Sequence, residues 1–268
     1  MIDMLNTRVQ ATEEQIAYYQ ENGFVQIDNV LSPEELEELR SHLNETMGHT
    51  GGNSIQTDAG GGAYYRVLNQ RVNTWRDHGG MARFVLGDRF ADLGKQLTSF
   101  AGVRLFHDHA LFKMPGDSKP TPWHQDRPYW PMSVDESKPL HGFSIWIALD
   151  DVDERNGCMM FVPKSQRIRN LKSVDLVTPE DIFMQQGASD MDRNTAVIVR
   201  MKAGSCTFHD GMTFHYAHAN STDQPRRALA IIYFEDGTLF SGADHVVTQG
   251  QGLVAGDRLA GPLFPKLA

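Results

Sequence analysis

The feature of this sequence that most constrains its fold is a succession of short apolar segments in its second half. These segments are rich in β-branched and aromatic residues, and Gly, Pro, Asn or Asp separates each one from the next. They cover residues 103–114, 143–152, 158–165, 194–201, 205–210, 213–219 and 227–236. Many short strands with turn residues between them are typical of an antiparallel β-sandwich or jelly roll.

The first hundred residues have a more helical pattern. Thr12 predicts the cap of a helix that ends at Gly23, and Ser32-Pro33 followed by two glutamates predicts a helix that runs to about Met47. Residues 24–30 alternate between apolar and polar, as a half-buried strand does, and residues 80–100 predict a further helical stretch.

This order of elements predicts a mainly β protein with flanking helices. We expect a double-stranded β-helix (a cupin-like jelly roll) whose core is buttressed by the N-terminal helices. No linker and no internal repeat divides the chain. The sequence therefore predicts a single domain over residues 1–268, with a helical part at about 1–100 and a jelly-roll core at about 101–240.

Composition excludes several classes of function. The chain has 34 acidic residues against 25 Lys and Arg, a net charge of -9, which argues against nucleic acid or an anionic membrane as a partner. The longest apolar run, residues 228–234, is far shorter than the roughly 20 residues of a membrane helix, and no signal peptide is visible at the N-terminus. Two cysteines cannot form a disulfide framework or a cysteine-rich zinc module. We expect a cytoplasmic protein with a small-molecule substrate, and no feature sets an oligomeric state.

Histidines are concentrated in the β-rich half, and the densest group of polar residues is Trp123-His124-Gln125-Asp126. In an extended segment, residues two apart project to the same face, so His124 and Asp126 can reach one point while Gln125 turns the other way. A His–Asp pair on a loop is common without a metal, so a third ligand is needed. His209, His215 and His218 are all candidates, and such a set suits either a non-haem Fe(II) centre or zinc.

Arg226 begins an otherwise apolar segment. Burying a guanidinium is costly unless an acidic group accompanies it, so an exposed position is the simpler interpretation for one of the two neighbours Arg226 and Arg227. The alternative is a clamp for a carboxylate, which guanidinium binds through two parallel hydrogen bonds.

These motifs resemble the phytanoyl-CoA dioxygenase family of Fe(II)- and 2-oxoglutarate-dependent oxygenases. The resemblance covers about residues 24–235 and depends on an ordered set of features. This set consists of the HxD motif, a strand with Trp146, an Asn-Gly-Cys-x-x-Phe-Val-Pro hairpin, a distal histidine and an arginine eleven residues after it.

The resemblance implies a role for several residues of this chain. His124, Asp126 and His215 would bind Fe(II), because the family's distal ligand begins an H-x-x-x-x-N segment and precedes the arginine by eleven residues. Arg226 would bind the far carboxylate of 2-oxoglutarate. The cosubstrate site would also include Trp146, His109 and Gln125. The substrate would lie between the iron and loops 51–65, 127–141 and 181–193, in a pocket lined by Tyr65, Tyr129, Trp130 and Met160.

Two positions depart from the family pattern. Relatives often have a serine two residues after the distal histidine, where this chain has Ala217, so we expect a different hydroxyl there, from Thr207 or Tyr233. The turn after the hairpin ends in Gln166 instead of histidine. Because Asp126 is present, halogenation, which in related enzymes uses a small residue at that position, is not expected.

The resemblance implies an enzyme that uses Fe(II), 2-oxoglutarate and O2 to hydroxylate an unactivated C–H bond of a small metabolite, with release of succinate and CO2. Desaturation and rearrangement occur in the same family, and the sequence does not name the substrate. Two alternatives remain: a cupin-like metal-dependent hydrolase or isomerase, which needs no carboxylate clamp at Arg226, and a non-catalytic jelly-roll binding module, which needs neither the ligands nor the clamp.

Overall fold

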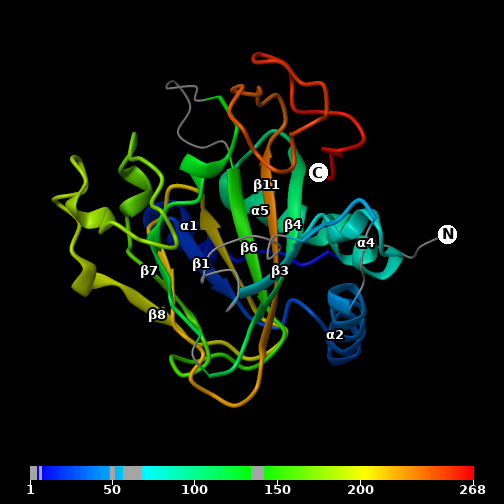
Figure 1. Ribbon diagram of the computed structural model, residues 1–268, viewed down its shortest axis with the longest axis horizontal. Coiled ribbons are helices and arrows are strands. Elements are labelled where there is room, and N and C mark those ends of the chain that lie inside the picture. Colours follow the sequence, from blue (N-terminus) through cyan, green and yellow to red (C-terminus); the bar gives the residue numbers. More distant parts are fainter. Residues whose placement is uncertain (1–4, 6–7, 49–51, 57–67, 117, 134–141) are drawn as a thin grey trace.

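The computed structural model describes residues 5, 8–48, 52–56, 68–116, 118–133 and 142–268 (Figure 1). Its helices are α1 (Glu13–Asn22), α2 (Pro33–Gly48), α4 (Gly79–Val85) and α5 (Asp88–Thr98), with short 3-10 helices η1 (Thr74–Arg76), η2 (Arg127–Tyr129), η3 (Ser165–Arg167), η4 (Ile182–Met184) and η5 (Arg193–Thr195). Its strands are β1 (Phe24–Ile27), β2 (Ile55–Gln56), β3 (Leu68–Val72), β4 (Val103–Lys113), β5 (Thr121–His124), β6 (Gly142–Ala148), β7 (Met159–Phe161), β8 (Val197–Val199), β9 (Cys206–Asp210), β10 (His215–Ala217) and β11 (Arg226–Glu235).

The strands form two antiparallel sheets, as the sequence predicts. The larger sheet has seven strands in the order β1-β9-β6-β11-β4-β3-β2, and the smaller has four in the order β5-β10-β7-β8. Neighbours within each sheet are mostly far apart in the sequence, which is the connectivity of a jelly roll. The prediction of a mainly β jelly roll with flanking helices is confirmed.

Alternation along the central strand β11 gives the larger sheet two different faces. Leu229, Ile231 and Tyr233 pack into a large apolar cluster against the helices, together with Leu39 of α2 and Phe90 of α5. The residues between them on β11 face the smaller sheet. The larger sheet therefore has a dry face under the helices and an inner face that looks toward β5, β7 and β10 (Figure 1).

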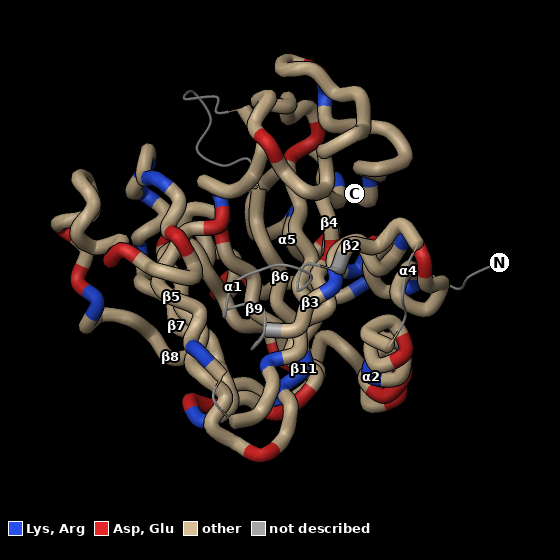
Figure 2. The backbone as a smooth tube through the Cα atoms, viewed as in Figure 1, with Lys and Arg blue, Asp and Glu red and all other residues tan. Residues whose placement is uncertain are grey.

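The helix ends follow the sequence signals. Thr12 and Gln15 form a capping box at the start of α1, and Gly23 ends this helix with a φ of 81°, a conformation that favours glycine. The acidic residues of α2 gather on its outer side (Figure 2), while Leu39 and Leu43 are buried.

The prediction of one helical stretch over residues 80–100 is wrong in detail. The chain forms two helices there, α4 and α5, because Gly87 is extended and caps the second one. In the part of the chain that the structure describes, no helix combines the length and apolar character needed to cross a membrane.

Beyond β11, the chain continues over one end of the larger sheet (Figure 1). Its last residues pair with the start of β4: the amide of Val103 donates to the carbonyl of Ala268, and the amide of Leu267 donates to the carbonyl of Val103. Phe240, Val247 and Phe264 pack with residues of the central strands in a separate apolar cluster. This C-terminal segment, residues 236–268, thereby becomes part of the wall around the inner face.

Candidate metal centre

A cavity of about 510 Å³ lies on the inner face of the larger sheet, between it and the smaller sheet. Side chains from β4, β6, β9 and β11 line one side, and side chains from β5, β7 and β10 line the other. His124, Asp126, His209, His215 and Arg226 are all among the lining residues. This volume lies in the range of about 300–1,000 Å³ that is usual for small-molecule sites.

Pairing of β5 with β10 brings two of the predicted ligands together. His124 and His215 are directly opposite each other in this antiparallel pair, and Asp126 follows two residues after His124. The Nε2 atoms of both histidines lie 3.5 Å from Oδ1 of Asp126. Potential ligand atoms of the three residues all lie within 4.8 Å of one another, which is close enough for them to bind one metal ion.

Backbone carbonyls fix which nitrogen of each histidine faces the cluster. Nδ1 of His124 lies 2.7 Å from the carbonyl oxygen of Pro122, and Nδ1 of His215 lies 3.0 Å from that of Thr213. Because a carbonyl only accepts, each Nδ1 carries the proton and each Nε2 presents its lone pair toward Asp126. Metal-binding histidines have this arrangement, so the residues present fit a divalent cation such as iron.

The electrostatics of the cluster favour the same protonation states. Burial tends to raise the pKa of the Asp126 carboxyl, but His215, His124 and His209 together hold that pKa well below its ordinary value. Burial, assisted by His124, lowers the pKa of His215 well below its ordinary value. Asp126 is therefore an anion and His215 a neutral imidazole, the forms in which both bind metals.

The second oxygen of Asp126 has its own partners. The hydroxyl of Ser144 donates to Oδ2 over 2.8 Å, and Nε2 of His209 lies 3.3 Å from the same atom. His209 therefore contacts the second carboxylate oxygen, and its ring centroid lies 4.7 Å from that of His215. His218 has a different environment, because its Nδ1 lies 3.0 Å from the carbonyl oxygen of Cys158 and its side chain is not among those lining the cavity. Of the three distal candidates, it is His215 that the fold brings to His124 and Asp126.

Arg226 and Arg227 point in opposite directions from β11, as strand alternation predicts. Arg226 is buried, lines the cavity, and holds its guanidinium carbon 5.0 Å from the centroid of the Trp146 ring. Arg227 pairs instead with Asp150 on the outer side, with Nη2 2.6 Å from Oδ1. The cavity thus has the His–Asp–His cluster and a guanidinium on its walls.

The hydroxyl expected in place of the family serine comes from neither predicted residue. Thr207 and Tyr233 are buried, but neither is among the residues that line the cavity. Tyr233 faces the helices as part of the large apolar cluster. Thr121 lines the cavity and lies directly opposite Ala217 in the pairing of β5 with β10.

The other predicted pocket residues divide into two groups. Four of them line the cavity, namely Trp146, His109, Tyr129 and Trp130. Tyr65 is outside the described residues.

Two predictions are wrong. The amide of Gln125 donates to the carbonyls of Ile168 and Met212 and does not reach the cavity, because adjacent residues of an extended segment face opposite ways. For the same reason Met159, rather than Met160, lines the cavity from β7.

Sequence reasoning missed the contribution of the C-terminal segment. His245 lies over the cavity with its ring 5.5 Å from that of His107 and nearly parallel to it, at 13°. Asp244 and Val246 line the cavity beside it. Their segment contains turns and no helix or strand, so periodicity could not have located it. By contrast, no residue of the predicted loop 181–193 lines the cavity.

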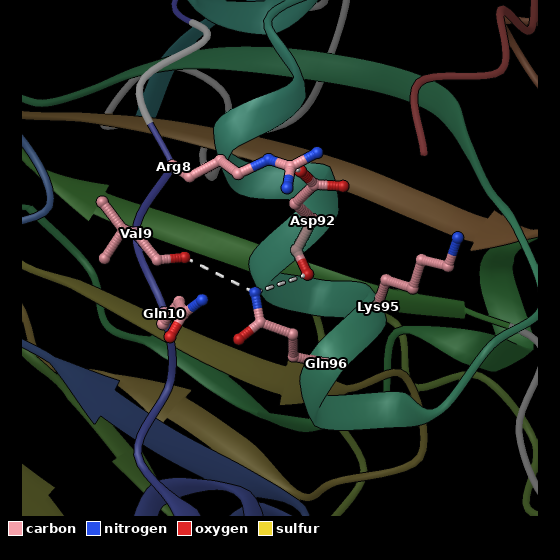
Figure 3. A pocket seen from close by; sticks show the side chains of 6 residues that line it. All are labelled: Arg8, Val9, Gln10, Asp92, Lys95 and Gln96. Carbon is pink, nitrogen blue, oxygen red and sulfur yellow. Dashed lines mark hydrogen bonds and ion pairs between the residues drawn. The ribbon is translucent and has the colours of Figure 1, made fainter.

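A second hollow, between residues 8–10 and α5, has a different character (Figure 3). Its walls include Arg8, which extends toward Asp92, and Gln96, whose amide donates to the carbonyls of Val9 and Asp92 (Figure 3). Its described walls contain no histidine or cysteine, and Arg8 and Gln96 already pair with neighbouring groups of the hollow. We therefore locate the chemistry in the cavity between the sheets.

Comparison with known proteins agrees with this geometry. The ectoine dioxygenase of Bordetella parapertussis is 24% identical over 238 residues, covering 82% of this chain and 74% of that protein. The peroxisomal phytanoyl-CoA dioxygenase of Homo sapiens is 23% identical over 234 residues, covering 82% of this chain and 67% of that protein.

Among solved structures, the non-heme alpha ketoglutarate dependent epimerase SnoN from nogalamycin biosynthesis is 28% identical, with a TM-score of 0.79 over 96% of this chain and 98% of that one. The same epimerase in complex with Fe3+, alpha ketoglutarate and nogalamycin RO has a TM-score of 0.78 and 29% identity, over 96% of this chain and 98% of that one.

The sequence profile of the phytanoyl-CoA dioxygenase family matches residues 19–228, which is most of the chain. The matched segment contains the histidine and aspartate cluster and Arg226. The relatives reported above are named as dioxygenases or as an alpha ketoglutarate dependent epimerase, and together with the His–Asp–His cluster they show an oxidoreductase that uses iron, 2-oxoglutarate and O2. The protein belongs to the phytanoyl-CoA dioxygenase family.

Proposed function

We propose that the enzyme hydroxylates an unactivated C–H bond of a small metabolite. In this proposal His124, Asp126 and His215 hold Fe(II), and Arg226 binds the far carboxylate of 2-oxoglutarate. The observation that carries it is the presence, in one cavity, of three ligand atoms within 4.8 Å of one another and of a buried guanidinium. A hydrolase or isomerase that used the same metal cluster would have no need of Arg226.

Iron bound with 2-oxoglutarate and O2 supplies the oxidation, with release of succinate and CO2. The residues of this chain have simpler tasks. The two imidazoles and the carboxylate would hold the metal and would leave it able to bind the cosubstrate and O2 as well. Arg226, with its guanidinium against the Trp146 ring, orients the cosubstrate by its far end. The surrounding side chains exclude water and hold the substrate near the metal.

Beside Asp244, the substrate side of the cavity is lined mainly by neutral groups. His107 and His245 form a stacked pair there, and burial lowers the pKa of His107 well below its usual range and that of His245 to about 4. Both rings are therefore neutral at physiological pH and offer hydrogen bonds without charge. Tyr129, Trp130 and Val246 add aromatic and apolar surface.

Cations that could bind a phosphate are few. Within the described part of the chain, Arg226 is the single Lys or Arg that lines the cavity. Because we assign Arg226 to the cosubstrate, no other Lys or Arg among the described residues of the cavity wall is left for an acyl-CoA ester or a phosphonate. A ring-bearing, hydroxylated molecule suits neutral imidazoles and aromatic walls better. The epimerase SnoN, which is similar to this chain, was crystallised with a small molecule, nogalamycin RO, and so supports a small-molecule substrate.

Epimerisation is the second candidate outcome, because SnoN is an epimerase at 28% identity and its relative SnoK, at 25% identity, is a carbocyclase. Hydroxylation, epimerisation and ring closure all begin by activating a C–H bond. Hydroxylation adds one oxygen atom to the substrate, whereas epimerisation and ring closure leave its number of oxygen atoms unchanged. Mass analysis of the product distinguishes them.

An anaerobic titration tests the proposed site. Fe(II) and 2-oxoglutarate added together to the apoprotein should give the weak visible charge-transfer band that is expected of this enzyme class, and neither should give it alone. Binding of Fe(II) without the band would favour the hydrolase or isomerase. Binding of neither would favour a non-catalytic module. The Arg227→Ala variant is the matched control, since its side chain lies on the outer side of the sheet.

A further inference from the structure

The last residue of β4, Lys113, is a lysine with 1% of its surface exposed. Its amino group donates to the backbone carbonyls of Ala217 and His218, at the end of β10. Among the described residues, no carboxylate forms an ion pair with it, and the groups that influence its charge are Arg226 and the thiol of Cys158. A buried amine with only carbonyl partners is costly to keep charged, so the burial of the Lys113 amino group requires an explanation.

Lys113 shares a small space with Arg226. The two residues are register partners in the pairing of β4 with β11. Both also pack against Gly157 of the hairpin turn, where an added methyl group would lie 3.0 Å from Cδ of Lys113 and 3.5 Å from Nε of Arg226. Gly157 has a φ of +102°, a backbone conformation that favours glycine. Because glycine has no side chain, Lys113 and Arg226 can both pack closely against it.

Two like charges this close in a dry interior are unfavourable, and only one of the two groups can readily lose its charge. Arginine stays protonated in proteins, whereas buried lysine gives up its proton. Burial first, and then Arg226, lowers the pKa of Lys113 to about 6. Lys113 is therefore a neutral amine above that pH when no anion is near.

The other groups around Lys113 do not alter this conclusion. Burial raises the pKa of the Cys158 thiol to about 12, so the thiol is neutral. The imidazole of His218 contacts the carbonyl of Cys158. The charged groups beyond Cys158, Glu154 and Arg200, pair with each other at the surface. Arg226 is thus the charged neighbour that matters for Lys113.

We propose that Lys113 is a second cationic group of the 2-oxoglutarate site, and that it takes up one proton from solvent when the cosubstrate binds beside Arg226. This inference rests on the proposed role of Arg226. The far carboxylate adds a negative charge where two cationic groups meet, so it stabilises the protonated amine. The amino group of Lys113 also lies next to Ala217, where relatives often have a serine, because it donates to the carbonyl of that residue.

Proton uptake gives the binding a pH dependence with a defined sign. Between a pKa of about 6 in the free enzyme and the higher pKa in the complex, binding requires one proton. The Kd for 2-oxoglutarate should therefore rise by about tenfold for each pH unit above that value. Removal of the amine should abolish this slope.

Calorimetry measures the proton directly. 2-Oxoglutarate is titrated into the anaerobic Fe(II)-loaded enzyme at pH 7.5 in HEPES and in Tris, whose ionisation enthalpies differ. We expect the wild type to take up about one proton for each cosubstrate bound, and Lys113→Met to take up none. Lys202→Met is the matched control, because Lys202 is exposed and paired with Asp151.

Lys113→Arg provides a second variant, in case the methionine variant does not fold. Its charge is permanent, so it should bind the cosubstrate without proton uptake. Binding by the wild type without proton uptake would overturn the inference, as would equal uptake by the Lys113 variants. Failure of the wild type to bind 2-oxoglutarate at all would instead contradict the proposed function.

Discussion

His124 and His215 are cross-strand partners whose ring centroids lie 4.1 Å apart. This pairing, together with the carbonyls that hold each Nδ1, positions both imidazoles before any metal arrives. Preorganised ligands lose little conformational entropy when they bind a metal, so the geometry of the site is a property of the fold.

Replacing any one of His124, Asp126 and His215 with alanine should abolish iron-dependent turnover and leave the fold largely intact. The two ligands that remain in each variant cannot replace the set of three that iron requires here. Anaerobic Fe(II) titration, with circular dichroism to check folding, measures both effects. His218→Ala is the control and should keep iron binding, because its ring contacts Cys158 instead of Asp126. An inactive His218→Ala beside an active His215→Ala would show that the distal ligand is assigned wrongly.

Ser144→Ala should weaken iron binding without removing a ligand. The Ser144 hydroxyl donates to Oδ2 of Asp126 over 2.8 Å and so fixes the rotation of the carboxylate. Loss of such a supporting hydrogen bond typically costs 10–100-fold in metal affinity. Competition with a chelator of known affinity gives the change in Kd. An unchanged Kd would mean that His209 alone is enough to orient the carboxylate.

Arg226→Ala should raise the KM for 2-oxoglutarate strongly and leave the affinity for Fe(II) nearly unchanged. Removing one partner of a buried, charge-assisted pair costs about 2–5 kcal/mol, or roughly 30- to 4,000-fold. Arg226→Lys should recover part of this loss, because an ammonium supplies charge without the planar fork. Succinate formation over a range of 2-oxoglutarate concentrations measures the effect.

Arg227→Ala is the internal control for that experiment. Its guanidinium binds Asp150 on the other side of the sheet, so its KM for 2-oxoglutarate should stay close to that of the wild type. Equal effects at the two arginines would contradict the assignment of the cosubstrate site.

Asp210→Asn should stabilise the protein at neutral and alkaline pH. Burial raises the pKa of the Asp210 carboxyl to about 7, although the amide of Met212 donates to it. A raised pKa means that the contribution of this group to stability is full below its unfolded pKa and is lost as the pH rises toward 7. The advantage of the asparagine variant should therefore grow between about pH 4 and 7, to at most about 4 kcal/mol. Urea unfolding at several pH values measures it, and a difference that did not vary with pH would contradict this explanation.

The sequence predicted those features that depend on local periodicity. Alternation along an extended segment separated Arg226 from Arg227, whereas His109, which lines the cavity, was assigned through the family resemblance. The prediction of Met160 made no use of alternation, and the phase of its three-residue strand cannot be read from so few residues. Alternation should have excluded Gln125 from the cavity, because its neighbours His124 and Asp126 both face the cavity.

The sequence could not predict contacts made by irregular segments. His245 reaches the cavity from a part of the chain that has neither helix nor strand, and its position depends on packing against Phe106 and His107. The proximity of Lys113 and Arg226 likewise depends on the register between two long strands. Register is a property of the folded sheet, which no single segment encodes.

The smaller sheet consists of strands of only three or four residues, and two of its four strands carry the histidines. So few ladder hydrogen bonds give such a sheet little stability of its own, and local opening of this layer should require less free energy than opening of the larger sheet. A metal ion bound between β5 and β10 would join these two strands only when they are paired. Binding to that closed form alone would suppress the opening by mass action. Bound iron would then stabilise the smaller sheet. Amide hydrogen exchange in β5, β7 and β10 should therefore slow when the apoprotein is loaded with metal.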